Sequence, residues 1–349
     1  MTAAPWDAII VGQGLAGTTL AWCLLEAGQR VLILDSCEPV TSSKIAAGLV
    51  TPITGQRLVL TAHCDEFLST ARKFYATIEM RTGQKFFHDR VATRLFKSSE
   101  ENENWSERSK RPTYQSHLLD PQPMPLLASE LGDSGEGGFA MHGAQLNVAA
   151  YLEASRNILP WEQLTLDWQN DVAFDPDGIS VQDHRTRRLI SCEGYAAARN
   201  PYFSSVSFNA AKGDILTVRF DRPILPHCLH RGIWLAPATE PDIFWVGSTY
   251  DWETLDQMPD ASARSEIEDK LKAFFHVPYT VLEHRAAVRP IITQSMALVG
   301  LHPEQERLGF FNGLGSKGSL HAPWYAQCLT DFLVHQTPLP GDVDIRKHI

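Results

Sequence analysis

The sequence lacks the positive charge and the long apolar runs that mark nucleic-acid-binding and membrane-spanning proteins. Its 349 residues carry a net charge of -10, which disfavours a general surface for RNA, DNA or anionic lipid. No apolar run of about 18 residues occurs without glycine or charge, and the first residues lack the basic region of a signal peptide. We therefore expect a cytoplasmic protein that has no membrane span and does not bind nucleic acid.

Metal-binding and disulfide patterns are also missing. The six cysteines are scattered and include no C-x-x-C pair, so we expect neither a zinc site nor a disulfide framework. The 13 histidines include no pair spaced four residues apart, so we expect no metal site. The motifs G-x-S-x-G, H-E-x-x-H and the P-loop are absent too, and no internal repeat is visible.

A strand, a glycine turn, a helix and a second strand are predicted in residues 7–35. The apolar run 8–11 is followed by three glycines in the spacing G-x-G-x-x-G, namely Gly12, Gly14 and Gly17. This pattern predicts a dinucleotide whose pyrophosphate lies at the N-terminus of the helix that begins near Leu15. Asp35, at the end of the second strand, can accept ribose hydroxyls and would repel a 2′-phosphate, so FAD or NAD is favoured over NADP.

A second glycine-rich segment, NGLGSKGSLHAP at 312–323, precedes the last predicted helix. Asn312, Ser316 and Lys317 add polar groups there that can meet an anion or a carbonyl-rich ring. One NAD needs only the first motif, whereas FAD can be held at its pyrophosphate by one helix terminus and at its ring by another. Ordinary turn chemistry before a helix is the alternative explanation for this segment alone.

The remaining pattern predicts a large α/β chain with a second sheet. Helices are expected at about 62–82, 151–159 and 261–275, and strands around 164–166, 179–181 and 188–192. Three β-like runs between 213 and 250 are separated by proline and glycine, which favours an antiparallel sheet. The charged stretch 98–111 has one aromatic residue and is expected to be a solvated excursion.

Taken in order, these motifs resemble the FAD-dependent oxidoreductases of the D-amino acid oxidase and glycine oxidase type. That family also includes the oxidoreductase half of the bifunctional enzyme that modifies the tRNA wobble uridine. The resemblance covers nearly the whole chain and is carried by GQGLAG with Asp35, SKIAAGLVTP at 43–52, LISCEG at 189–194, KGDILTV at 212–218, VRP at 288–290 and NGLGSKGSLHAP.

The resemblance implies an α/β fold with a Rossmann-like FAD-binding domain of the GR2 type. This domain would be discontinuous and comprise residues 1–83, 143–202 and 285–349. A substrate-binding domain built on an antiparallel sheet would comprise 84–142 and 203–284. FAD would be bound non-covalently, because the region 288–313 contains none of the cysteines that tether the flavin in one branch.

The resemblance also implies which residues contact FAD. The first glycine motif would hold the pyrophosphate, Asp35 the adenosine ribose, the segment 46–48 the flavin side, and Val172 the adenine. The second glycine motif would lie along the pyrimidine edge of the flavin. The full set is Gly12, Gly14, Leu15, Ala16, Gly17, Asp35, Ala46, Ala47, Gly48, Val172, Gly194, Gly313, Gly315, Ser316, Lys317 and Gly318.

The implied reaction is hydride transfer from the carbon that bears the nitrogen of a small amino acid or related amine to the flavin. Arg289 is the candidate that binds the substrate carboxylate, because guanidinium forms two parallel hydrogen bonds with it. Tyr250 and Trp252 are candidates for the pocket wall, with plain packing as the alternative. A tRNA-modifying oxidoreductase and a non-catalytic flavin-binding protein stay open, as do the substrate, the electron acceptor and the oligomeric state.

Overall fold

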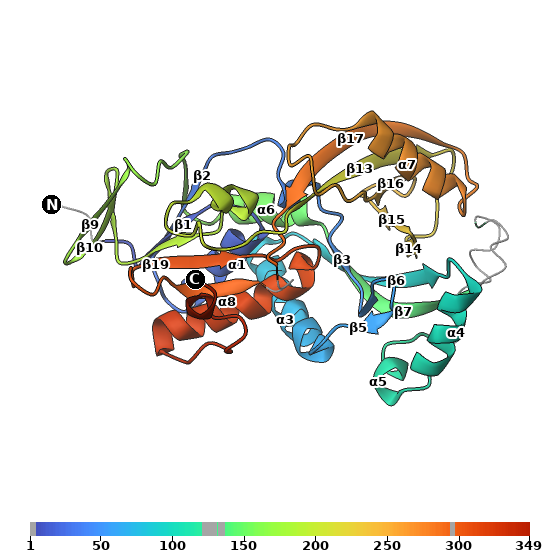
Figure 1. Cartoon of the computed structure of the whole chain (residues 1–349), viewed down its shortest axis with the longest axis horizontal. Coiled ribbons are helices and arrows are strands. Elements are labelled where there is room, and N and C mark those ends of the chain that lie inside the picture. Colours follow the sequence, from blue (N-terminus) through green and yellow to red (C-terminus); the bar gives the residue numbers. More distant parts are fainter. Residues whose placement is uncertain (1–4, 121–130, 132–136, 294–296) are drawn as a thin grey trace.

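The computed structural model describes residues 5–120, 131, 137–293 and 297–349 (Figure 1). One large sheet has the strand order β18-β19-β12-β1-β2-β8. Its strands β8, β2, β1, β12 and β19 run parallel to one another, and β18 runs antiparallel to β19. The bounds are Ala8–Val11 for β1, Val31–Asp35 for β2, Trp161–Gln163 for β8, Leu189–Ser191 for β12, Leu298–Leu301 for β18 and Leu308–Asn312 for β19.

Side chains of β1 alternate between two hydrophobic layers that cover this sheet. Ala8 and Ile10 pack with four helices, whereas Ile9 and Val11 pack with a small three-stranded sheet. Burial on both faces explains why this strand is a continuous apolar run in the sequence. The helices are α1 at Leu15–Glu26, α3 at Cys64–Thr82, α6 at Val148–Arg156 and α8 at Gly318–His335, and the small sheet contains β9 at Val172–Asp175, β10 at Gly178–Val181 and β11 at His184–Thr186.

The second large sheet has the order β17-β13-β16-β15-β14-β6-β7-β3, and in Figure 1 it extends away from β9 and β10. Helix α7, Ala261–Lys272, packs on one of its faces through Ile267 and Leu271. The strands are β3 at Leu49–Val50, β6 at Phe87–Leu95, β7 at Gly138–Leu146, β13 at Ala211–Phe220, β14 at Cys228–Arg231, β15 at Ile233–Pro237, β16 at Ile243–Gly247 and β17 at Tyr279–Arg289.

The predicted antiparallel pairing holds for the strands between 213 and 250, and one junction of the larger sheet is parallel. Strands β14 and β6 pair in parallel, and the other neighbours in this sheet are antiparallel. These two strands are far apart in the sequence, so no hairpin turn forces them to run in opposite directions. This parallel pair joins two halves of the sheet that come from different stretches of the chain.

The charged stretch 98–111 is not a solvated excursion, which corrects the prediction. It forms α4 at Ser99–Arg108, whose first turn is capped by the Ser98 hydroxyl accepting the N–H of Glu101 at 3.3 Å. Trp105 is 7% exposed and stacks on Phe139 with 3.7 Å between ring centroids. One buried tryptophan is therefore enough to anchor a helix whose other residues are polar.

Shorter elements complete the described chain. The predicted strand around 164–166 is instead β8, which ends at Gln163, so the segment after it is irregular. The segment 36–54 contains a helical turn and two short strands. These short elements are α2 at Ser42–Ile45, α5 at Pro112–Gln115, β4 at Ile53–Thr54, β5 at Val59–Leu60, and the 3-10 turns at Gly194–Arg199 and Ile345–Lys347. Within the described ranges, no helix combines the length and the apolar character needed to cross a membrane.

Replacing Trp105 with alanine should lower the free energy of unfolding by about 3 kcal/mol or more, because a buried tryptophan leaves a large cavity when truncated. Trp252→Ala is the matched control, because Trp252 is 55% exposed and its loss should cost less than about 1 kcal/mol. Urea unfolding of both variants measures the difference. Equal losses would contradict the anchoring role of Trp105.

Candidate active site

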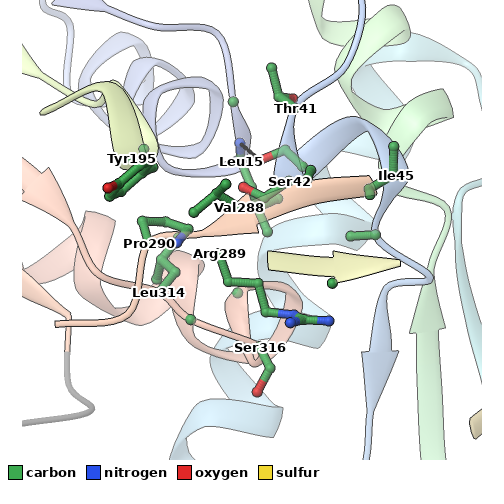
Figure 2. Close-up of a pocket in the computed structure, with 18 of the residues that line it drawn as sticks. Leu15, Thr41, Ser42, Ile45, Tyr195, Val288, Arg289, Pro290, Leu314 and Ser316 are labelled. Carbon is green, nitrogen blue, oxygen red and sulfur yellow. Dashed lines mark hydrogen bonds between the residues drawn. The ribbon is translucent and has the colours of Figure 1, made fainter. Parts of the chain in front are cut away.

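A cavity of about 1790 Å³ lies between the two large sheets and is lined by both glycine motifs (Figure 2). Figure 2 shows Leu15 of α1, Ser42 of α2, Arg289 of β17 and Ser316 before α8 around this one pocket. Segments from the two ends of the chain therefore meet there. The predicted residues that line the cavity are Gly12, Gly14, Leu15, Ala16, Asp35, Ala46, Ala47, Gly48, Gly194, Gly315, Ser316, Lys317, Gly318, Tyr250 and Arg289.

Four predicted residues lie outside this lining. Gly17 packs against Gly12, which is a lining residue. Gly313 lies in the sequence between the lining residues Asn312 and Leu314. Trp252 is exposed and stacks on Tyr250. The fourth, Val172, is in β9, whereas the irregular segment 164–169 does line the cavity. The sequence pattern placed a strand where this lining segment is, which explains why the segment was missed.

Close packing fixes the start of α1 against the sheet. A Cβ atom on Gly17 would lie 2.0 Å from the carbonyl oxygen of Gly12, and Gly12 itself has a φ of +103°. Only glycine fits both positions without displacing backbone. The first turn of α1 is thereby held at the edge of the cavity, and there the N–H of Leu15 donates to the Ser43 hydroxyl at 3.0 Å. Ser43 was not predicted as a site residue.

Asp35 is held in a fixed orientation at the end of β2. Its Oδ2 accepts the backbone N–H of Gln13 at 2.7 Å, and its Oδ1 accepts the N–H of Cys37 at 3.0 Å. The guanidinium of Arg156 lies 3.3 Å from Oδ1. The carboxylate thus ties the glycine turn to β2, and Asp35 lines the cavity.

The second glycine motif brings the N-terminus of α8 next to that of α1. A Cβ atom on Gly318 would lie 2.8 Å from Cδ2 of Leu15. Lys317 lines the cavity and its Nζ donates to the Thr61 hydroxyl at 3.1 Å. No carboxylate of the described chain lies within ion-pair distance of Lys317, and burial lowers the pKa of this lysine below its ordinary value. Two helix N-termini and a half-buried cation therefore face one space.

Arg289 lies at the end of β17 and reaches into the cavity (Figure 2). Its guanidinium donates to the carbonyl oxygen of Thr249 at 3.3 Å and to the Ser248 hydroxyl, and it lies 4.3 Å from the ring centre of Tyr250. These partners are neutral, and among the described residues no carboxylate is within ion-pair distance of it. Burial lowers the pKa of Arg289, and Tyr250 and the carboxylate of Asp214, which is not paired with it, offset only part of this effect.

Gly213 makes room for this arginine. A Cβ atom on Gly213 would lie 1.9 Å from a terminal nitrogen of the Arg289 guanidinium. The segment KGDILTV belongs to the family resemblance, but its glycine had no assigned role. Gly213 of β13 pairs with Ala287 of β17. A side chain at position 213 would therefore point to the space that the Arg289 guanidinium occupies.

Several further lining residues were not predicted. Glu193 accepts hydrogen bonds from the Trp168 indole at 3.1 Å, from the Ser191 hydroxyl at 2.6 Å and from the Asn200 amide at 3.1 Å. Arg94, Lys97 and His230 line the cavity from the second sheet. No local sequence signal marks any of these residues. In the part of the chain that is described, no group of three or more His, Cys, Asp or Glu side chains is arranged to hold a metal ion.

Three solved structures share this fold. The chain superposes on a glycine oxidase from Bacillus cereus with a TM-score of 0.79 at 16% identity, covering 95% of this chain and 96% of that one. A glycine oxidase from Geobacillus kaustophilus gives 0.78 at 18% identity, covering 99% of each chain. An iminodiacetate oxidase from a Chelativorans species gives 0.74 at 17% identity, covering 98% of each.

A family described as FAD dependent oxidoreductase matches residues 7–332, which is almost the entire chain. Both glycine motifs, the cavity between them and Arg289 fall inside that range. The predicted family, fold class and FAD cofactor are therefore confirmed. The chain belongs to the DAO family of FAD-dependent oxidoreductases, and it is an FAD-dependent enzyme.

Proposed function

We propose that this enzyme oxidises the C–N bond of a small amino acid or related amine whose carboxylate is bound by Arg289. The observation that supports this most is the state of Arg289, a half-buried guanidinium that lines the cavity and is bonded only to neutral oxygens. A buried charge is costly unless it meets an opposite charge. A substrate carboxylate supplies that charge and matches the planar fork of the guanidinium.

The residues of the cavity fit FAD. Its volume of about 1790 Å³ exceeds the roughly 300–1,000 Å³ typical of sites for drug-sized ligands, which leaves room for a long dinucleotide. The N-terminus of α1 is a site for an anion such as a pyrophosphate. The Gln13 side-chain amide lines the cavity, and its buried Nε2 has no hydrogen-bond partner within the described residues.

We infer the following placement of FAD. The turn from Gly12 to Gly17 would hold the pyrophosphate, and Asp35 the adenosine ribose. The residues Ala46, Ala47 and Gly48 would lie on the flavin side. The segment 164–169, rather than Val172, would supply the wall at the adenine end, because that segment lines the cavity.

This placement of FAD gives the two large sheets different roles. The parallel sheet and its helices would form the FAD-binding domain, with the proposed segments 1–83, 143–202 and 285–349. The mixed sheet would form the substrate domain, with the segments 84–142 and 203–284. Arg289 is the last residue of β17 and lines the cavity at the junction of the two proposed domains. A substrate must lie at this junction to contact both domains.

A bound flavin supplies the hydride acceptor. Arg289 would fix the carboxylate end of the substrate and so orient the carbon that bears the nitrogen. Tyr250, whose ring lies against the guanidinium, would limit the movement of that side chain. Lys317 and the N-terminus of α8 would stabilise negative charge on the side of the cavity that they line.

Anaerobic mixing of the yellow holoenzyme with amino acids tests the proposed reaction. Glycine, sarcosine and a panel of D-amino acids are added separately, and the flavin absorbance is followed. At least one of them should bleach the flavin, because the substrate reduces it in the absence of another acceptor. An unchanged flavin spectrum with every amine would reject the proposed reaction.

Replacing Arg289 with glutamine should raise KM for the reducing amino acid by on the order of 100-fold, because charged hydrogen bonds to the carboxylate are lost. FAD content should stay unchanged. Arg285→Gln is the matched control, because Arg285 lies on the same strand and pairs with Glu283. Steady-state kinetics of both variants give the comparison, and an unchanged KM in the Arg289 variant would remove its assigned role.

Replacing Gly17 with alanine should yield protein without FAD, because the added Cβ would displace the carbonyl of Gly12 and with it the turn that faces the pyrophosphate. Gly83→Ala is the control, since Gly83 ends α3 in a left-handed conformation with open space around it. The ratio of flavin to protein absorbance in purified samples is the measurement. Full FAD occupancy in the Gly17 variant would contradict the placement.

A further inference from the structure

We propose that the cavity contains a second anion-binding subsite, formed by Arg94, Lys97 and His230, that selects amine substrates carrying a second anionic group. We call these three residues the distal subsite. The inference rests on the proposed function and narrows its substrate class. The anionic group is a carboxylate or a phosphate at the far end of the substrate from the carboxylate that Arg289 binds.

The distal subsite and the Arg289 site lie on one face of the second sheet. Across neighbouring strands, Arg94 pairs with His230, His230 with Trp234, and Trp234 with Gly247. Residues paired in this way point to the same face, and of these four Arg94, His230 and Trp234 line the cavity. The residue after Gly247 is Ser248, whose hydroxyl accepts from Arg289.

The opposite face of the same strands is filled. Leu95, Leu229, Leu235 and Val246, each next in sequence to one position of the row, belong to the hydrophobic core beneath α7. The other face of the row is the one on which Arg94, His230 and Trp234 line the cavity. Three strand spacings of about 4.8 Å separate Gly247 from Arg94, so the backbone at the two ends is about 14 Å apart. A substrate as short as glycine therefore cannot contact Arg289 and the distal subsite at the same time.

Arg94 is a buried part of this subsite, only 5% exposed. Its guanidinium pairs with Glu101 at 2.9 Å and contacts Nδ1 of His230. Its Nε is buried and has no hydrogen-bond partner in the described chain. Glu101 thus compensates the charge of Arg94, but the Nε–H of Arg94 can still donate a hydrogen bond.

His230 supplies a neutral donor. Burial, together with the charges of Arg94 and Lys97, lowers the pKa of His230 to about 3, so the ring is uncharged near neutral pH. A neutral imidazole that accepts through Nδ1 carries its proton on Nε2. The ring can therefore donate one hydrogen bond to an anion without adding charge.

Lys97 is an exposed lysine that supplies a second positive charge to the subsite; partial burial lowers its pKa, and the nearby carboxylate of Glu101 raises it. Its amine lies above Gly232, where a Cβ atom would be 3.5 Å from Nζ, and both residues line the cavity. No carboxylate of the described residues is within ion-pair distance of Lys97. Lys270, the other lysine at this end, is paired with Glu266. This positive charge beside a neutral donor matches a single anionic group.

Ligand binding to the holoenzyme tests this subsite. Straight-chain dicarboxylates of increasing length are titrated against the flavin spectrum, and monocarboxylates of equal length serve as controls. Carboxylates that end in a phosphate form a parallel series that distinguishes the two anion types. Above a threshold length, the doubly anionic ligands should bind about tenfold more tightly than the matched monocarboxylates, because a second charged contact is added.

Lys97→Gln should reduce this advantage to about twofold or less, because the lysine charge is gone. Lys110→Gln removes a charge from an exposed pair with Glu107 and should keep the tenfold advantage. His230→Gln provides a second variant, which should also reduce the ratio. Because the readout is a ratio of two affinities in the same variant, a general loss of affinity does not imitate the result.

Failure of the subsite and failure of the proposed function give different results. Should amino acids reduce the flavin while double anions show no advantage at any length, the subsite is overturned and the amine oxidation stands. The same holds if the advantage persists in both the Lys97 and the His230 variants. Should neither amine reduction nor carboxylate binding occur, the proposed function itself is rejected.

Discussion

The close approach of the α1 and α8 N-termini at the edge of the parallel sheet is the constraint on which the site depends. Gly17 lets α1 pack on the glycine turn, and Gly318 lets the start of α8 touch Leu15. Each helix N-terminus carries backbone N–H groups that have no partner within the helix, together with a partial positive charge. Placed side by side, the two termini make one elongated space that favours an anionic and carbonyl-rich molecule, and FAD is such a molecule.

Two of the cations that line the cavity have no ion-pair partner among the described residues, although the chain as a whole is acidic. The net charge is -10, yet Arg289 and Lys317 line the cavity and are held by neutral oxygens. Burying cations without counter-charges costs folding energy that the sheets and helices around them must offset. This cost has a functional meaning, because an anionic cofactor or substrate regains it on binding. An acidic exterior does not interfere, since distant exposed charges are screened by salt.

The second sheet extends the site because of an unusual pairing. The parallel contact of β14 with β6 sets His230 beside Arg94, although the two residues are 136 positions apart in the sequence. Helix α4 then adds Glu101 to this pair and is itself anchored by Trp105. A stretch that looks like a solvated charge run thus holds, through Glu101, an arginine that lines the cavity. This arrangement links the stability of α4 to the shape of the far end of the pocket.

The sequence by itself determined the glycine turn with Asp35 at the end of the next strand, the long helices and the second glycine motif, because turns, caps and helical periodicity are set by residues close together in the chain. Arg289 was a candidate through the family resemblance. Only the tertiary structure decided that residues 164–169 rather than Val172 line the cavity, and that Gly213 makes room for Arg289. It also decided that Trp105 is buried and that Trp252 lies outside the lining. These facts depend on strand register and on which distant segments pack together, and such long-range pairing leaves no periodic signal in the residues that take part in it.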